Sequence, residues 1–429
     1  MASVSRRPGT LVGRRAAAMS NRHAGRRSEA TRSSVYETDL LQTYLEERGR
    51  NPSHVATIQA LVRKRQPKHT NELEWLKDEP GLPKNAIERI AEQFVAINSH
   101  VVRKQVSKDG STVKLLVQLH DGMQVETVIL RYEPQKGKNA MAPDQRRDGA
   151  PRSTLCVSSQ VGCQMACKFC ATGKMGIKGN LTQGEILEQL HHASRITEIR
   201  NVVFMGMGEP LNNYRNVVSA SKLMMSRKVF NIRRLTISTV GIPSKIKMLP
   251  HDLPGCHLAL SLHAPSQEKR LEIVPSAKAF PLHKLMDAVH QYLQYARHRS
   301  IFVEYILLSG VNDSVEEARN LGILLHDMQV TVNLIPYNPA FPTGEDTFAA
   351  PSAGNIVAFQ KCLREDFGIR TTIRQEMGQD IDGACGQLAN KEMKDIEDLP
   401  CGVSSISEKK TSLVGMLAGI RRTLNFSAR

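Results

Sequence analysis

Three cysteines of this sequence lie close enough together to do chemistry as a group. Cys163, Cys167 and Cys170 fall within the stretch GCQMACKFC and have the spacing C-x3-C-x2-C. Three thiolates on one short loop can bind three corners of an iron–sulfur cubane, and the fourth iron then keeps an open position. A structural zinc site that adds Cys156 is the alternative. Zinc sites of four cysteines usually pair two short C-x2-C units across a longer loop, so the spacing favours the cluster.

The composition limits the classes of protein to which this chain with its three clustered cysteines can belong. The chain has 429 residues and eight cysteines, too few for a disulfide scaffold, so we expect free thiols in a reducing compartment. No apolar run approaches the roughly 20 residues that span a bilayer, so we expect no membrane segment. The formal net charge of +16 indicates an acidic partner such as RNA or DNA, unless basic tails account for the excess.

Composition also divides the chain into four segments. Residues 1–35 form a basic leader, and its first 28 residues contain seven arginines and no acidic residue, as in organelle transit peptides and in disordered basic tails. Residues 36–105 predict a small helical accessory domain that contacts RNA. Residues 106–390 predict the main domain, and residues 391–429 a basic tail. Within the main domain, alternating residues around a DG turn at 121–122 predict a hairpin, and residues 134–152 predict a long surface loop.

From residue 154 onward, short β-branched runs alternate with helical patterns. Helices are predicted at 182–197, where Thr182 and Glu185 have the spacing of a capping box, and at 282–297, where apolar residues recur on one face. Such alternation predicts an α/β fold with a parallel sheet. Six or seven units are too few for a closed eight-stranded barrel, so we expect a partial (β/α)6-type TIM barrel, with a doubly wound sheet as the runner-up. The strands are predicted at residues 154–158, 201–205, 234–239, 257–262, 301–308, 330–335 and 369–374.

The unusual segments follow these strands, where the active sites of such folds gather. The cysteines follow the first strand, MGMGEP follows the second, and STVG, SLH and NLIPYNP end later ones. Together they resemble the radical S-adenosylmethionine (SAM) superfamily, in which the open iron of a 4Fe-4S cluster is chelated by SAM. The resemblance implies that Cys163, Cys167 and Cys170 hold this cluster. It implies SAM contacts at Gly208, Glu209, Ser238, Ser261, Leu262, His263 and Asn333.

A narrower resemblance covers roughly residues 80–390. VETV, TLCVSSQVGCQMACKFCATG, VVFMGMGEPLNN, ALSLHAP, VNLIPYNP and DIDGACGQL occur in the order typical of the RlmN/Cfr family of RNA adenine methyltransferases, and they most resemble the RlmN branch. This resemblance implies that Cys385 carries a methyl group as S-methylcysteine. It further implies that Cys156 is the resolving thiol, which forms a disulfide with Cys385, and that Glu126 accepts a proton from the adenine ring.

The resemblance also implies a substrate and partners. The expected reaction methylates carbon 2 of an adenine in 23S-type rRNA, and tRNA is a possible second substrate. It uses two SAM molecules and an electron donor such as a flavodoxin or ferredoxin. Methylation of carbon 8, as in the Cfr branch, and another radical SAM reaction are the alternatives, and a zinc-stapled RNA-binding protein is a distant one. The expected compartment is a plastid or mitochondrion if the leader is a transit peptide, and otherwise the cytoplasm.

Overall fold

A ten-stranded sheet organises the part of the chain that the structure describes. The structure is a computed structural model, and it describes residues 32–66, 73–87, 89–132, 152–340 and 347–389. The strand order is β14-β13-β12-β11-β10-β9-β6-β5-β4-β3. Neighbours from β6 to β14 pair in parallel, whereas β3 to β6 pair antiparallel. The parallel strands are β6 (Arg152–Cys156), β9 (Asn201–Phe204), β10 (Arg234–Thr239), β11 (His257–Ser261), β12 (Ile301–Leu307), β13 (Val330–Pro336) and β14 (Arg370–Ile373).

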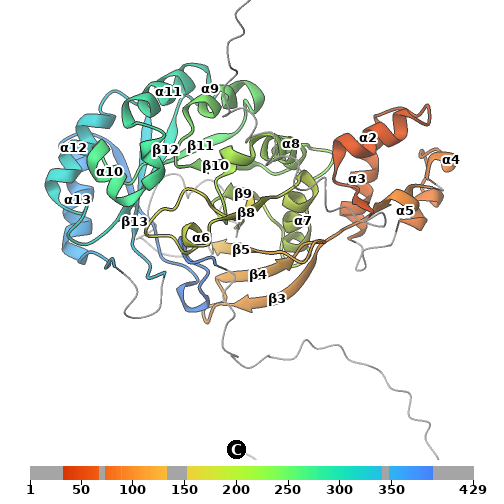
Figure 1. Cartoon of the computed structure of the whole chain (residues 1–429), viewed down its shortest axis with the longest axis horizontal. Coiled ribbons are helices and arrows are strands. Elements are labelled where there is room, and N and C mark those ends of the chain that lie inside the picture. Colours follow the sequence, from red (N-terminus) through yellow and green to blue (C-terminus); the bar gives the residue numbers. More distant parts are fainter. Residues whose placement is uncertain (1–31, 67–72, 88, 133–151, 341–346, 390–429) are drawn as a thin grey trace, which may run out of the picture. The chain divides into compact units, whose positions relative to one another are not determined.

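Helices connect successive parallel strands, and they lie outside the strands in Figure 1. The predicted capping box is present at the start of the first helix, since Thr182 Oγ1 accepts from the Glu185 N–H at 3.2 Å and Glu185 Oε2 accepts from the Thr182 N–H at 2.8 Å. This arrangement satisfies two N–H groups that the helix itself cannot pair. The helices are α7 (Gln183–Ser194), α8 (Tyr214–Met225), α9 (Pro243–Asp252), α10 (Gln267–Ile273), α11 (Leu282–Tyr295), α12 (Val315–Leu325) and α13 (Ala353–Glu365).

The predicted partial barrel and hairpin are both confirmed. Within the described residues, the sheet order begins at β14 and ends at β3, so the strands do not close on themselves. The hairpin is formed by β4 (Thr112–Gln118) and β5 (Gln124–Tyr132), with Gly122 at a φ of 85° in its turn. Because β5 also pairs with β6, the hairpin extends the parallel sheet at the edge where the chain enters it.

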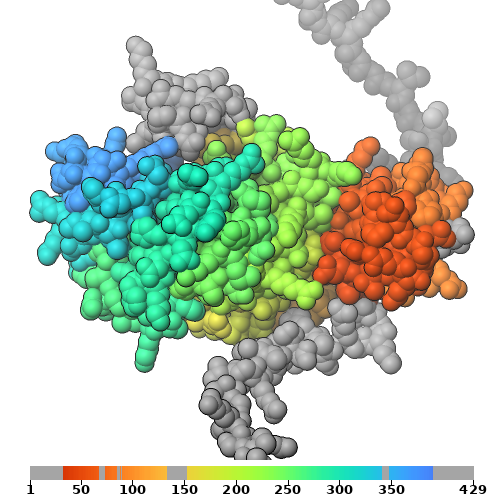
Figure 2. Space-filling view, turned by 90° about the horizontal axis from the view of Figure 1, so that it is seen from above, coloured from red at the N-terminus to blue at the C-terminus, as the bar shows by residue number. Residues whose placement is uncertain are grey.

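Helices dominate the N-terminal residues, as predicted, but only as far as Gln93. They are α2 (Thr38–Glu46), α3 (His54–Arg65), α4 (Lys84–Ile87) and α5 (Ile90–Gln93), with a 3-10 turn at Glu74–Asp78. Two short strands, β1 (Ser33–Ser34) and β2 (Phe94–Val95), pair in parallel beside them. Residues 100–105, which were expected to belong with these helices, lie instead in β3 (His100–Val106) of the large sheet. In Figure 2 the red and orange atoms of the helices form one surface beside green atoms of the later chain.

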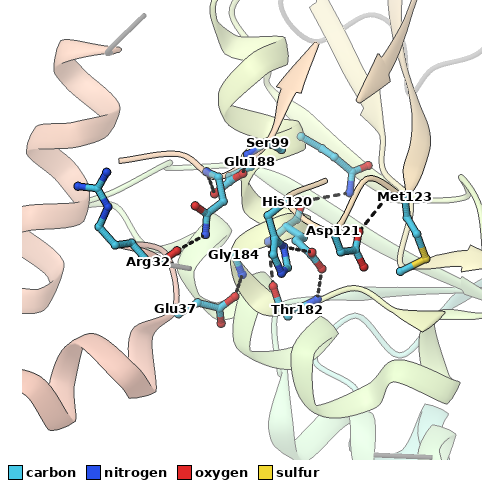
Figure 3. Close-up of polar contacts among 12 residues, drawn as sticks. Arg32, Glu37, Ser99, His120, Asp121, Met123, Thr182, Gly184 and Glu188 are labelled. Carbon is cyan, nitrogen blue, oxygen red and sulfur yellow. Dashed lines mark hydrogen bonds and ion pairs between the residues drawn. The ribbon is translucent and has the colours of Figure 1, made fainter. Parts of the chain in front are cut away.

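Helix α7 joins the N-terminal residues to the sheet through buried polar contacts. The carboxylate of Glu188 accepts from the backbone N–H groups of Asn98 at 2.9 Å and Ser99 at 2.8 Å. The Gly184 N–H, in the first turn of α7, donates to Glu37 at 3.0 Å. Figure 3 shows Glu188 and Gly184 of α7 in contact with Ser99 and Glu37 of the N-terminal segment. The N-terminal segment is therefore anchored to α7.

Several predicted segments lie outside the described residues. These are residues 1–31 of the leader, residues 134–151 of the expected surface loop, and residues 391–429 of the basic tail. No helix of the described chain is long and apolar enough to cross a membrane.

Candidate active site

The three-cysteine segment is a loop whose base is closed by two short strands. β7 (Gln160–Gly162) and β8 (Ile177–Asn180) pair antiparallel, and the Cys163 N–H donates to the Gly176 carbonyl at 3.0 Å. Gly162 has a φ of 75°, and a Cβ at this position would collide with the Gly176 carbonyl, so only glycine fits before the first cysteine. The short helix α6 (Ala171–Lys174) begins directly after Cys170.

The three thiols lie near one another and are largely shielded from water. Cys167 is buried, and Cys163 and Cys170 are half-buried. Burial raises the pKa of Cys163 to about 12 and that of Cys167 well above its usual range, so thiolates here need a positive partner such as iron. Among the described residues, no three His, Cys, Asp or Glu side chains converge as the ligands of one metal ion do. Three thiolates on one loop can each bind a different iron of a 4Fe-4S cubane, which is the chemistry that the sequence predicts here.

The glycine and glutamate of MGMGEP are fixed by close contacts after β9. Gly208 has a φ of 97°, and a Cβ there would lie 2.5 Å from the Gln160 side chain. Glu209 is 3% exposed and accepts from the Thr239 hydroxyl at 2.7 Å and from the Val240 N–H at 2.9 Å. Burial raises the pKa of this carboxyl group, and the hydrogen bonds oppose the shift. Glu209 therefore ties the loop after β9 to the loop after β10 at the predicted SAM site.

The predicted SAM contacts from STVG and SLH come together at the ends of β10 and β11. The hydroxyl oxygens of Ser238 and Ser261 are 3.2 Å apart. His263 is buried at a φ of 63°, and its Nδ1 accepts from the Ile306 N–H at 3.1 Å. Burial lowers the pKa of His263 to about 3, so the ring is neutral and its proton sits on Nε2. The ring meets Phe169 edge-on at 4.8 Å between centroids, next to the last cysteine.

The two asparagines of NLIPYNP have different surroundings. Asn333 donates from Nδ2 to Glu304 at 2.9 Å and accepts at Oδ1 from the Thr372 hydroxyl at 2.5 Å, so both ends of its amide are used inside the sheet. Asn338 is 5% exposed, lines a cavity, and its Oδ1 has no hydrogen-bond partner among the described residues. Of the two, Asn338 is the one that offers a free group to a ligand, although the sequence favoured Asn333 because it ends a strand.

One cavity brings the predicted methyl carrier and the predicted resolving thiol together. Its volume is about 80 Å³, and Cys156, Cys170 and Cys385 all contribute to its wall. Cys156 is the last residue of β6, whereas Cys385 lies in the loop after β14. Burial, and then the nearby Cys385 sulfur, raise the pKa of Cys156 to about 12, and both residues are free thiols. The cavity therefore joins these two cysteines to one of the predicted cluster ligands.

Hydrogen bonds hold the Cys385 loop against the cysteine cluster loop. The Ala171 N–H donates to the Gly386 carbonyl at 2.8 Å, and the Thr172 hydroxyl donates to the Leu388 carbonyl at 2.5 Å. Ala171 and Thr172 directly follow the last cysteine of the cluster segment. The two loops are thus joined although they are more than 200 positions apart in the sequence.

Glu126 reaches the same loop from the hairpin. Its side chain is on the face of β5 that also presents Val128 and Leu130 to the cavity, because alternate residues of a strand share a face. One carboxylate oxygen lies 3.1 Å from Lys114 Nζ, and the other accepts from the Ala389 N–H at 2.9 Å. The structure thus places the predicted proton acceptor beside the loop of the predicted methyl carrier.

Three cations at the site were not identified from the sequence. Lys114 pairs with Glu126, as described above. Arg374 lines the cavity, and its pKa is raised by the Cys385 sulfur and by a nearby carboxyl group. Arg270 of α10 is buried and donates to the carbonyl of Leu262 at 3.1 Å. A single Lys or Arg without regular spacing gives no signal in a sequence, so only the fold reveals these residues.

Comparison with known proteins identifies the family. Residues 157–322 match the Radical SAM superfamily model. A probable dual-specificity RNA methyltransferase RlmN from Thermus thermophilus is 43% identical over 317 residues, which cover 72% of this chain and 83% of the relative. The ribosomal RNA large subunit methyltransferase N of Nitrosopumilus maritimus is 41% identical over 321 residues, covering 73% and 87%.

A solved structure supports the same relationship. The crystal structure of a radical SAM methyltransferase from Sphaerobacter thermophilus matches with a TM-score of 0.70 and 33% identity, covering 83% of this chain and 99% of that chain. The identities and the coverage are high enough to assign the family, and with it a 4Fe-4S cluster and SAM as cofactors. The chain therefore belongs to the RlmN family of radical SAM RNA methyltransferases.

Proposed function

We propose that this enzyme methylates carbon 2 of an adenine in 23S-type rRNA, and in tRNA as a second substrate, through an S-methylcysteine at Cys385. The observation that carries the proposal is the shared cavity of Cys156, Cys170 and Cys385. A methyl group carried by a cysteine needs a carrier thiol, a second thiol that releases the product, and the radical source within reach of one another. The name of the Nitrosopumilus relative supports rRNA as a substrate, and the name of the Thermus relative supports an RNA methyltransferase of dual specificity.

Each step of this reaction has a group of the chain to perform it. Cys385 takes a methyl group from a first SAM molecule. A 4Fe-4S cluster held by Cys163, Cys167 and Cys170 would supply the electron that cleaves a second SAM, and the radical from that cleavage would remove a hydrogen atom from the S-methyl group of Cys385. The methylene carbon then bonds to carbon 2 of the adenine, and Glu126 accepts the proton of the ring. The Cys156 thiolate attacks the Cys385 sulfur, so that the disulfide forms as the bond between that sulfur and the methylene carbon breaks. The released carbon would take up a proton to become the methyl group, the one electron left over would return to the oxidised cluster, and an external reductant would restore both thiols.

The proposed SAM site combines the predicted contacts with one residue that the structure adds. Asn338 joins them because its Oδ1 is buried without a partner in the cavity wall, whereas the amide of Asn333 is used within the sheet. The SAM contacts in this proposal are Gly208, Glu209, Ser238, Ser261, Leu262, His263 and Asn338.

The proposal also includes partners. The N-terminal helices and the exposed basic residues of β3, Arg103 and Lys104, contact the RNA phosphates, because such contacts supply much of the affinity for RNA. The single electron comes from a donor such as a flavodoxin or ferredoxin. The arginine-rich leader directs the enzyme to an organelle with a bacterial-type ribosome.

Mass spectrometry of rRNA and tRNA nucleosides tests the proposal. We expect 2-methyladenosine to depend on the gene and to be absent with Cys385→Ala. We expect Cys156→Ala to trap a covalent enzyme–RNA adduct, because the releasing thiol is missing. Cys362→Ala is the matched control, since Cys362 is a buried cysteine on α13. Product formation by Cys385→Ala would refute the carrier role, and 8-methyladenosine in place of 2-methyladenosine would refute the assigned carbon.

A further inference from the structure

Arg270 is a buried cation without a carboxylate partner in the part of the chain that the structure describes. The side chain is 1% exposed, and among the described residues it is the largest of the fully buried side chains. Burial lowers its pKa to about 10, which leaves the guanidinium charged at neutral pH. Burying a charge is costly unless hydrogen bonds and an opposite charge compensate it. Some anion must therefore complete this environment.

Two of the guanidinium nitrogens already have partners at the predicted SAM site. Nε donates to the Leu262 carbonyl at 3.1 Å, and Nη2 donates to the Val240 carbonyl at 2.5 Å. These carbonyls belong to the segments that follow β11 and β10. The third nitrogen, Nη1, is buried and has no hydrogen-bond partner among the described residues. An unmade hydrogen bond from a charged donor is expensive, so Nη1 marks a position for an acceptor.

The surroundings of Arg270 place that acceptor at the cysteine cluster loop. The Lys168 N–H, between the second and third cysteines, donates to the Ile273 carbonyl at the end of α10 at 3.0 Å. Cys167 lies close enough for its sulfur to oppose the loss of charge at Arg270. The ring of His263, which is close enough for the Arg270 charge to act on it, is neutral and is already hydrogen-bonded through Nδ1. Helix α10 therefore presents its buried cation to the loop that holds the cluster.

We propose that Nη1 of Arg270 donates to the thiolate sulfur of Cys167 once that sulfur is bound to the 4Fe-4S cluster, and that the positive charge of Arg270 raises the reduction potential of the cluster. The reduced cluster carries one more negative charge than the oxidised cluster, so a cation beside it stabilises the reduced form. Hydrogen bonds to the sulfurs and nearby charge are established determinants of cluster potentials. Arg270 is thus a positioning residue that joins the cluster loop to the segments after β10 and β11. The proposal does not depend on which adenine carbon is methylated.

The carboxylate of SAM is a second anion that could accept from Nη1, and the potential measured without SAM separates the two. The probes are the full-length, anaerobically reconstituted Arg270→Gln and Arg270→Lys variants, followed by redox titration of the reduced-cluster EPR signal. Gln removes the charge but keeps an amide donor for the carbonyls, and Lys keeps the charge. The matched control is Lys269→Met, because the neighbouring Lys269 bonds to Val311 and Glu317 instead.

Without SAM, we expect Arg270→Gln to lower the equilibrium constant for reduction of the cluster at least tenfold. For one electron, this is a shift of the reduction potential by about 59 mV to a more negative value. Arg270→Lys and Lys269→Met should stay close to wild type. If Arg270→Gln retains no iron but Arg270→Lys does, the need for the charge is supported. The proposal is overturned if Arg270→Gln keeps the wild-type potential, if its shift appears only with SAM, or if both variants lose iron equally. Wild-type iron and sulfide contents verify the cluster separately from the methylation product.

Discussion

The buried pair of Lys114 and Glu126 makes a prediction whose size follows from the structure. Nζ and Oε1 are 3.1 Å apart, and the two side chains are 4% and 6% exposed. Lys114→Met removes the cation but fills a similar volume, so the buried Glu126 carboxylate loses the positive charge that lies 3.1 Å away. Breaking a buried pair from one side costs about 3–5 kcal/mol, most of it from the uncompensated charge. We therefore expect the free energy of unfolding to fall by about that amount.

A double-mutant cycle measured by urea denaturation under anaerobic conditions tests this reasoning. Lys114→Met and Glu126→Met should each be strongly destabilising, whereas the double variant should recover most of the loss, because two apolar side chains replace two ions. Lys361→Met is the control, since Lys361 forms an exposed pair with Glu365 at 3.7 Å and should cost below about 1 kcal/mol. The reasoning fails if the losses at 114 and 126 simply add, or if Lys114→Met costs no more than the control.

Three further predictions follow from the site and from α7. Gly208→Ala forces a side chain into a φ of 97°, a strain of about 1–3 kcal/mol, so SAM binding measured by calorimetry should weaken, and wild-type affinity would contradict this. Asn338→Ala should weaken SAM binding roughly 2- to 10-fold through one lost hydrogen bond, whereas Asn333→Ala should chiefly lower stability, and the reverse result would exclude our choice of asparagine. Burial lowers the pKa of His191 to about 3 and of His192 to about 4. Below the unfolded value of about 6.5, only the unfolded chain takes up these protons. The stability that the two neutral histidines contribute is thus fully present above pH 6.5. It falls toward pH 4 by roughly 1.4 kcal/mol per pH unit for each histidine, and pH-independent urea midpoints would contradict this.

The positions of the parallel strands along the chain could be predicted because such strands leave a strong local signal. Their residues are buried on both faces, so they appear as short continuous runs of apolar and β-branched residues. The runs at 234–239 and 257–262 became β10 and β11 with at most one residue of difference. The edge strand β3 had no such signal, because nearly all of its residues are exposed on both faces. Without burial there is no alternation to distinguish a strand from a charged helix, which is why residues 100–105 were assigned to the helical segment.

The same distinction separates the parts of the site that the sequence could and could not predict. The three cluster cysteines share one loop, so their spacing directly limits the metal centre that they can bind. Cys156 and Cys385 become neighbours only through the fold, and no local pattern links them, so their pairing depended on the resemblance to a family. The contacts of Lys114 and Arg270 have neither a local pattern nor a motif, because each joins elements that meet only when the sheet is complete. A buried cation near a reactive centre is costly unless an anion of that centre compensates its charge. Variants of Lys114 and Arg270 should therefore best distinguish an effect on the assembly of the site from an effect on the stability of the fold.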